Sequence, residues 1–187
     1  VDASALTSSL AAFTFISQED STATINVTSG AGADTLTAGV EKSNLSGGGS
    51  NDTFTFTTAG LTSLDTVAGG DGVDILTISD ASTLIDSDFN NITSVATINN
   101  GTTNGAQTIT LGSAADAAGI ATITGNGSGV ETVTVGAGFD NALTISLGSG
   151  PAQSDDIDAS ASAAAITVTS TASAITANDT ILGGTGT

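Results

Sequence analysis

Short stretches in which apolar residues alternate with threonine recur along most of the chain. Alternation with a period of two residues is typical of a half-buried β-strand. The stretches that show it are Thr24–Thr28, Thr53–Thr57, Val95–Ile98, Thr108–Leu111, Ala121–Thr124, Thr132–Val135, Leu143–Leu147 and Ile166–Thr169. The pattern predicts an all-β fold of many short strands. One segment, the alanine-rich stretch 114–119, could form a helix, although it is too short to be stable alone.

A nine-residue motif predicts how these strands are arranged. Residues 69–77 (GGDGVDILT) fit every position of the calcium-binding repeat G-G-x-G-x-D-x-U-x, in which U is a large apolar residue. The same motif occurs, less completely, at residues 29–37, 38–46, 47–55 and 60–68. All five nonapeptides share one register, which is interrupted only by residues 56–59. A shared register is not expected from a high glycine content alone.

The length of the motif predicts which residues of successive coils stack on one another. Two nonapeptides complete one coil of a parallel solenoid, so residues about 18 apart stack. Asp34 and Asp52 stand in that relation, whereas Ser43 occupies the same motif position on the opposite side. We therefore predict a parallel β-solenoid (a β-roll or β-helix) with calcium-binding Gly/Asp turns, and no metal beside Ser43. The alternative is an antiparallel sheet with ordinary Gly/Asp hairpin turns.

The residue types of the turns suit a hard cation. Glycine reaches positive φ and lets backbone carbonyls approach one another, and the aspartate of the motif adds a charged oxygen. Calcium takes six to eight such oxygen ligands. The candidate metal-binding residues are Gly30, Gly32, Asp34, Gly48, Asn51, Asp52, Asp65, Gly70, Asp71, Gly72, Asp74, Asp140 and Asp179. Asp140 belongs to a partial motif at 135–143, and Asp179 to one at 174–182.

Composition narrows the possible functions. The chain has 19 acidic residues and one basic residue, Lys42, and a formal net charge of −18, which disfavours nucleic acid and anionic lipid as partners. Bound Ca²⁺ would offset part of that charge. The chain has no His, Cys or Tyr, so the usual catalytic pairs of nucleophile and base cannot be built, and we expect no enzyme. No apolar run is long enough to span a membrane.

Four segments can be distinguished. Residues 1–28 are expected to continue a longer solenoid, 29–90 to form a calcium β-roll, 91–150 to form Thr/Ser-rich coils, and 151–187 to begin a further module that ends in a truncated repeat. The similarity of Val1–Ala5 (VDASA) to Ile157–Ala161 (IDASA) suggests tandem modules. Pro151 would then mark a joint between them.

The succession of GAGADTLT, GGGSNDTFTF, LDTVAGGDGVDILTISD and ITSVATIN resembles the C-terminal solenoid of bacterial surface-layer proteins with RTX repeats. The likeness covers most of the chain. It implies secretion by a type I system, calcium-driven folding outside the cell, and assembly with other copies into a lattice at the cell surface. Attachment to a cell-surface polysaccharide would belong to a part of the protein that is not present here.

The expected function is accordingly a structural element of an extracellular surface layer or filament that calcium folds and assembles. A calcium-dependent adhesin stalk, an ice-binding solenoid and the calcium domain of a passenger enzyme are the alternatives. Ice binding would need a row of threonines on one face, for which the candidates are Thr108/Thr110, Thr122/Thr124 and Thr132/Thr134. The uneven spacing of these pairs argues against such a row.

Overall fold

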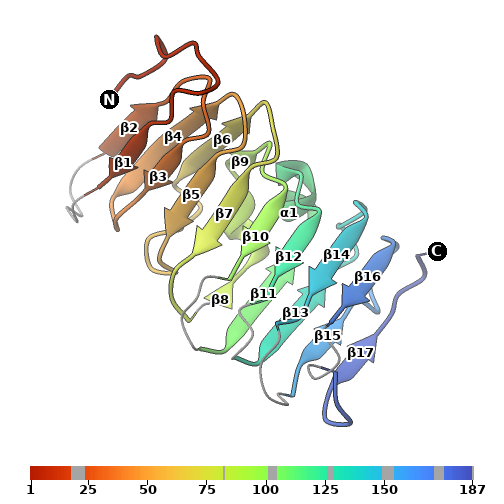
Figure 1. Ribbon diagram of the computed structural model, residues 1–187. Coiled ribbons are helices and arrows are strands. Elements are labelled where there is room, and N and C mark those ends of the chain that lie inside the picture. Colours follow the sequence, from red (N-terminus) through yellow and green to blue (C-terminus); the bar gives the residue numbers. More distant parts are fainter. Residues whose placement is uncertain are drawn as a thin grey trace.

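The computed structural model of the protein is a stack of coils that forms a parallel β-solenoid of about seven turns, with the N-terminus at the left and the C-terminus at the right of Figure 1. The structure describes residues 1–17, 24–81, 83–100, 105–125, 129–148, 154–170 and 175–186. Pro151 lies outside these ranges. Every pair of hydrogen-bonded strands in the described part is parallel, which confirms the solenoid and excludes antiparallel hairpins there.

One long sheet runs the length of the molecule, and we call it the eight-stranded sheet. Its strands are, in spatial order, β1 (Thr14–Ile16), β3 (Thr35–Thr37), β5 (Thr53–Phe56), β7 (Ile75–Ile78), β10 (Thr97–Asn99), β12 (Thr122–Thr124), β14 (Leu143–Ser146) and β16 (Ile166–Thr169). The eight strands lie side by side in Figure 1. This sheet crosses all four segments expected from the sequence without a break in its pairing.

Two shorter sheets complete the coils. The four-stranded sheet contains β2 (Thr24–Thr28), β4 (Lys42–Gly48), β6 (Thr66–Gly70) and β9 (Ile92–Thr93). The five-stranded sheet contains β8 (Thr83–Leu84), β11 (Gln107–Leu111), β13 (Glu131–Val135), β15 (Asp156–Asp158) and β17 (Thr180–Leu182). The chain changes from the first to the second within one coil, because β8 and β9 both lie between β7 and β10.

Helical segments lie where the two short sheets meet. A 3₁₀ helix, η1 (Asp86–Phe89), separates β8 from β9, and α1 (Ser113–Ala118) follows β11. The position of α1 agrees with the predicted helix, and Gly119 ends it at φ 94°. Asp86 holds the start of α1, because its carboxylate accepts the N–H groups of Gly112 at 2.7 Å and Ala115 at 3.0 Å. Neither the 3₁₀ helix nor the change of sheet was predicted.

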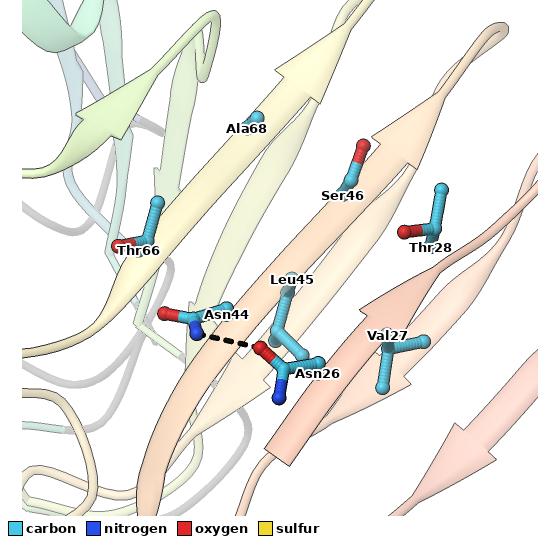
Figure 2. A pocket seen from close by; sticks show the side chains of 8 residues that line it. All are labelled: Asn26, Val27, Thr28, Asn44, Leu45, Ser46, Thr66 and Ala68. Carbon is cyan, nitrogen blue, oxygen red and sulfur yellow. Dashed lines mark hydrogen bonds between the residues drawn. The ribbon is translucent and has the colours of Figure 1, made fainter. Parts of the chain in front are cut away.

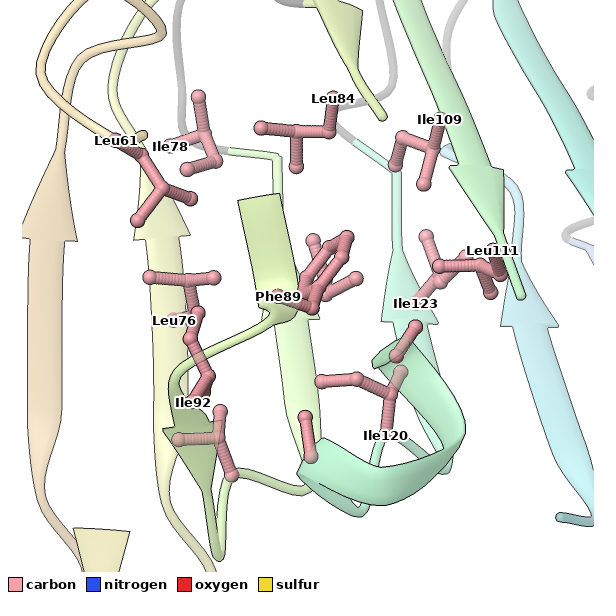
Figure 3. Packing of buried hydrophobic residues seen from close by; sticks show 14 of the residues in the cluster. Leu61, Leu76, Ile78, Leu84, Phe89, Ile92, Ile109, Leu111, Ile120 and Ile123 are labelled. Atoms are coloured by element: carbon pink, nitrogen blue, oxygen red, sulfur yellow. The ribbon is translucent and has the colours of Figure 1, made fainter. Parts of the chain in front are cut away.

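The core is a single apolar cluster enclosed by the coils. Phe54 and Phe56 are fully buried, as their alternation predicts, and Phe89 fills the interior where the short sheets meet. Figure 3 shows Phe89 among Leu84, Ile109 and other aliphatic side chains from several coils. Burial of each large side chain stabilises the fold by about 1.5–3 kcal/mol relative to exposure.

The coil length differs from the prediction over most of the chain. Asp34 and Asp52 are in contact across 18 residues, as two nonapeptides require. Asp52 and Asp74 are separated by 22 residues, and Glu131 and Asp155 by 24, because the turns carry extra residues. Each strand nevertheless keeps its register, so the insertions change turns rather than strand pairing.

The three candidate threonine pairs do not form one row, in agreement with the argument from their uneven spacing. Thr122 and Thr124 belong to the eight-stranded sheet, whereas the other two pairs belong to β11 and β13 of the five-stranded sheet. The three pairs therefore cannot form one face. The sequence shows that a strand alternates but does not show to which sheet it belongs, so the pairs could not be assigned to a face from the sequence.

The two DASA segments adopt the same local structure. The Ser4 N–H donates to Asp2 at 2.9 Å, and the Ser160 N–H donates to Asp158 at the same distance. The backbone N–H of the alanine that follows each aspartate donates to a strand residue of the next coil, Thr28 in one case and Leu182 in the other. The sequence similarity at these two places therefore reflects an equivalent turn in two coils.

Candidate metal centre

Three aspartates stack at one edge of the solenoid and form what we call the carboxylate ladder: Asp34, Asp52 and Asp74. Each immediately precedes a strand of the eight-stranded sheet. The Asp34 N–H donates to Asp52 Oδ1 at 2.8 Å, and the Asp52 N–H donates to Asp74 Oδ1 at 2.8 Å. All three side chains are buried. The sequence register predicted that Asp34 and Asp52 stack, and the structure adds Asp74 to them across a longer coil of 22 residues.

The opposite edge carries Asp65, as the register also predicts. Its Oδ1 accepts the N–H of Ser43 at 2.7 Å. Its Oδ2 accepts both the N–H and the hydroxyl of Thr62, at 2.8 Å and 2.9 Å. Asp65 is thus buried with partners for both oxygens, and its hydrogen bonds close a turn within the protein.

The two aspartates at positions 52 and 74 differ from Asp65 in one respect. Oδ2 of Asp52 and Oδ2 of Asp74 are buried and have no hydrogen-bond partner in the described part of the chain. Asp34, at the N-terminal end of the ladder, instead receives the Gly30 N–H on its Oδ2 at 3.1 Å. A buried carboxylate oxygen without a partner is costly, so these two atoms require a ligand or a proton.

Backbone oxygens converge on the same two atoms. A Cβ atom placed on Gly47 would lie under 3.0 Å from both Asp52 Oδ2 and the Gly69 carbonyl oxygen. A Cβ atom on Gly69 would collide in the same way with Asp74 Oδ2 and the Ser94 carbonyl oxygen. Each glycine therefore leaves room for a carboxylate oxygen and a carbonyl oxygen from different coils, which is a donor set that suits Ca²⁺. Gly47 and Gly69 were not among the predicted residues, although they hold the first position of the motif.

The predicted turn glycines adopt the backbone conformation that only glycine tolerates well. Gly48, Gly70 and Gly72 have φ of 94°, 105° and 132°. Gly70 also approaches the Gly48 carbonyl so closely that a Cβ atom would collide with it. Gly30 and Gly32 make equivalent approaches to carbonyls of the preceding coil. These residues shape the turns, and they bring carbonyl oxygens toward successive coils.

The electrostatics of the ladder disfavour ionisation. Burial raises the pKa of Asp52 to about 7, the hydrogen bond from the Asp34 N–H opposes that rise, and the neighbouring charges of Asp74 and Asp34 add to it. Burial likewise raises the pKa of Asp74, against the hydrogen bond from the Asp52 N–H. A divalent cation beside these oxygens would favour their charged forms.

The remaining predicted residues lie outside this arrangement. Asn51 Oδ1 accepts the Val73 N–H at 2.9 Å, which joins successive turns, and Asp71 is exposed while its N–H donates to the Gly48 carbonyl. Asp140 is exposed, and its N–H donates to Asp116. Asp179 accepts the Asp155 N–H at 2.9 Å and the Thr176 N–H, as Asp65 does with its own neighbours.

A second acidic row was not predicted. The Glu131 N–H donates to Asp155 Oδ1 at 2.9 Å, and Asp155 in turn donates to Asp179. The side chains of Glu131 and Asp155 are buried; Glu131 is the first residue of β13, and Asp155 immediately precedes β15. The sequence signal that could have revealed this row is an acidic residue at, or directly before, the start of an alternating stretch. In the described residues, no three acidic side chains gather as a metal cluster, so a cation site would need backbone carbonyls as well.

A shallow recess of about 220 Å³ lies on the four-stranded sheet (Figure 2). Asn26, Asn44, Thr66 and neighbouring small residues line it, and the Asn44 amide donates to Asn26 Oδ1 at 2.7 Å. None of the lining side chains is ionisable. The recess therefore offers hydrogen bonds and hydroxyl groups, but its lining has no ionisable side chain that could act as a general base.

Comparison of the chain with protein-family models, with curated proteins and with solved structures finds no match. In the described part of the chain, no helix has the length and apolar character that crossing a bilayer requires.

Proposed function

We propose that this chain is a structural segment of an extracellular surface layer or filament, and that calcium folds and assembles it. The observation that carries the proposal is the pair of buried, unpartnered oxygens, Asp52 Oδ2 and Asp74 Oδ2. They lie beside backbone carbonyls at glycine turns. The resemblance of the sequence to surface-layer proteins with RTX repeats supports the same function.

Asp52 and Asp74 would hold the ions together with the carbonyl oxygens of Gly69 and Ser94. Bound calcium would supply positive charge to buried oxygens that otherwise have to be protonated. The hydrogen bonds from the N–H groups of Asp34 and Asp52 fix the two carboxylates in place. Because those N–H groups belong to the preceding coil, holding a carboxylate at one turn also orders the turn beside it.

Charge connects calcium to folding. The formal net charge of −18 opposes a compact chain, and only one basic residue is present to compensate it. A site made of residues from two coils does not exist in the unfolded chain, so the free energy of binding becomes free energy of folding. Millimolar calcium outside a cell would then fold a chain that stays loose at cytosolic calcium.

A structural role also accounts for the lack of catalytic side chains. The sequence has no His, Cys or Tyr, and Lys42 is exposed on β4 while its neighbour Ser43 is buried. The recess on the four-stranded sheet has no ionisable lining. We therefore propose a protein that is not an enzyme, whose partners are further copies of itself.

Two measurements test the proposal. Circular dichroism and thermal unfolding should show a folded protein in millimolar calcium and a loss of β-structure in excess EGTA, with magnesium as the control cation. Negative-stain microscopy in calcium should show sheets or filaments. A spectrum and a melting temperature that chelation leaves unchanged would refute calcium-driven folding. A calcium-folded protein that stays monomeric at all concentrations would favour an adhesin stalk instead.

A further inference from the structure

The outer face of the eight-stranded sheet carries two parallel ranks of side chains. Residues in each rank are register partners on neighbouring strands. The first rank consists of Thr14, Thr35, Thr53, Ile75, Thr97, Thr122, Thr144 and Thr167. The second consists of Ile16, Thr37, Thr55, Thr77, Asn99, Thr124, Ser146 and Thr169. We call these two ranks the threonine face.

Strand preference alone does not explain this face. Threonine favours strands in general, so a mere preference would place it equally on all three sheets. The five-stranded sheet also has outward threonines in β11 and β13, but Asp156 and Asp158 follow them in β15, and the four-stranded sheet has Lys42 in β4 and Ala68 in β6. The threonine face has no charged residue at any position, although the chain as a whole has a net charge of −18.

The geometry of the face is regular. Neighbouring strands are about 4.8 Å apart, and alternate residues along a strand are about 6.6 Å apart, so the positions of the two ranks form a rectangular grid. Hydroxyl groups occupy every position of it except Ile16, Ile75 and Asn99. Threonine has few side-chain rotamers because it is β-branched, which keeps the grid ordered. All the side chains are exposed or half-exposed. The unequal lengths of the coils do not disturb the grid, since the turns absorb the extra residues.

We propose that the threonine face binds ice. The repeats of the grid are close to those between water molecules on a face of hexagonal ice, so ordered water can occupy the gaps between hydroxyl groups as part of the crystal. Hydroxyl groups form hydrogen bonds with that water. The methyl groups beside them form no hydrogen bonds, so they do not hold hydration water in an arrangement that differs from ice. Charged groups, which organise water around themselves, are missing from the face. The ligand is therefore the surface of an ice crystal, and this activity goes beyond the structural role proposed above.

The test uses the whole chain, folded in calcium, and two matched variants. Thr122→Lys places a long charged side chain in the middle of the face, on β12. Thr132→Lys makes the same change on β13 of the five-stranded sheet, where Thr132 is also half-exposed and also has a threonine, Thr108, as one register partner. Circular dichroism and melting temperature confirm that both variants fold.

Partition of each protein into a slowly growing ice crystal is measured, together with thermal hysteresis. The wild-type protein and Thr132→Lys should enter the ice and lower the freezing point below the melting point. Thr122→Lys should be excluded from ice and lose most of the hysteresis. Thr122→Val, which keeps the shape and removes the hydroxyl, should lose part of both.

Three results would overturn the proposal. One is exclusion of the folded wild-type protein from ice to the same extent as a globular protein of similar charge. Another is an equal loss in Thr122→Lys and Thr132→Lys. The third is binding of the wild-type face to a protein or polysaccharide, abolished by Thr122→Lys, without any entry into ice. None of these results bears on calcium-driven folding, which the EGTA measurement tests separately.

Discussion

Replacing Asp52 by asparagine should stabilise the calcium-free protein and weaken the effect of calcium. Asparagine keeps an oxygen that can accept the Asp34 N–H, the hydrogen bond that Asp52 Oδ1 makes at 2.8 Å. Its amide nitrogen takes the place of the unpartnered Oδ2, beside Gly47, where the Gly69 carbonyl oxygen also lies. The substitution therefore removes a buried charge without removing the ladder contact.

The magnitude follows from the pKa. Burial raises the pKa of Asp52 from 3.8 to about 7. Because one pKa unit corresponds to 1.36 kcal/mol, ionising Asp52 costs up to about 4 kcal/mol more in the folded protein than in the unfolded protein. Because the folded pKa lies above the unfolded one, the folded state gains protons, and its stability is complete below pH 3.8 and falls as the pH rises to about 7. Calcium would offset that loss.

Urea unfolding followed by circular dichroism measures the effect, in EGTA and in millimolar calcium, from pH 4 to pH 8. In EGTA the wild-type protein should lose stability over this range, and Asp52→Asn should lose less, so that the variant is the more stable protein at neutral pH. In calcium the order should reverse, since the variant gains less from the ion. At pH 4 the two proteins should be nearly equal.

Asp65→Asn is the matched control. Asp65 is buried at the equivalent motif position, but the N–H of Ser43 and both donors of Thr62 already satisfy its oxygens. An asparagine nitrogen would face a donor there, which costs about 1–3 kcal/mol. The control should therefore be destabilised equally in EGTA and in calcium. If Asp52→Asn behaved like this control, the assignment of Asp52 to a metal site would be wrong.

Three further substitutions test other parts of the structure. Gly69→Ala should abolish calcium-dependent folding, because its Cβ would collide with Asp74 Oδ2 and the Ser94 carbonyl; Gly183→Ala, with no atom within 4 Å, should change the calcium midpoint little. Phe89→Ala should destabilise the fold by about 3–5 kcal/mol in urea unfolding, since Phe89 is fully buried where the sheets meet. Asp86→Ala should lower the melting temperature and reduce helical signal, because Asp86 accepts the N–H groups that begin α1, and calcium should not restore either.

Much of the fold could be predicted from local pattern. The alternating stretches correspond to strands, for example Thr24–Thr28 to β2 and Ile166–Thr169 to β16. The nine-residue register placed Asp34 next to Asp52, and it placed Ser43 on the other edge. Both inferences succeed because period-two burial and a fixed coil of two motifs are local properties of the sequence.

The prediction failed where the coil length varies. After Asp52 the coils are longer, and the extra residues lie in turns that have no periodic signal. Strand patterns alone do not show how many residues separate one strand from its partner, so β11 and β13 could not be told apart from β12 by alternation. The acidic row of Glu131 and Asp155 was missed for the same reason, since its members are 24 residues apart and belong to no nonapeptide.

The structure also distinguishes among the motif aspartates, which the motif itself does not do. By sequence, the aspartates at positions 34, 52, 65 and 74 are equivalent members of one repeat. The structure divides them by hydrogen bonding, because Asp34 and Asp65 use both oxygens within the protein while Asp52 and Asp74 keep one oxygen free. We propose that a motif aspartate either closes a turn or binds a cation, and that neighbouring N–H groups decide between these roles. Under the proposed function, ions bind at Asp52 and Asp74, the middle and C-terminal members of the carboxylate ladder, and Asp34 and Asp65 make hydrogen bonds alone.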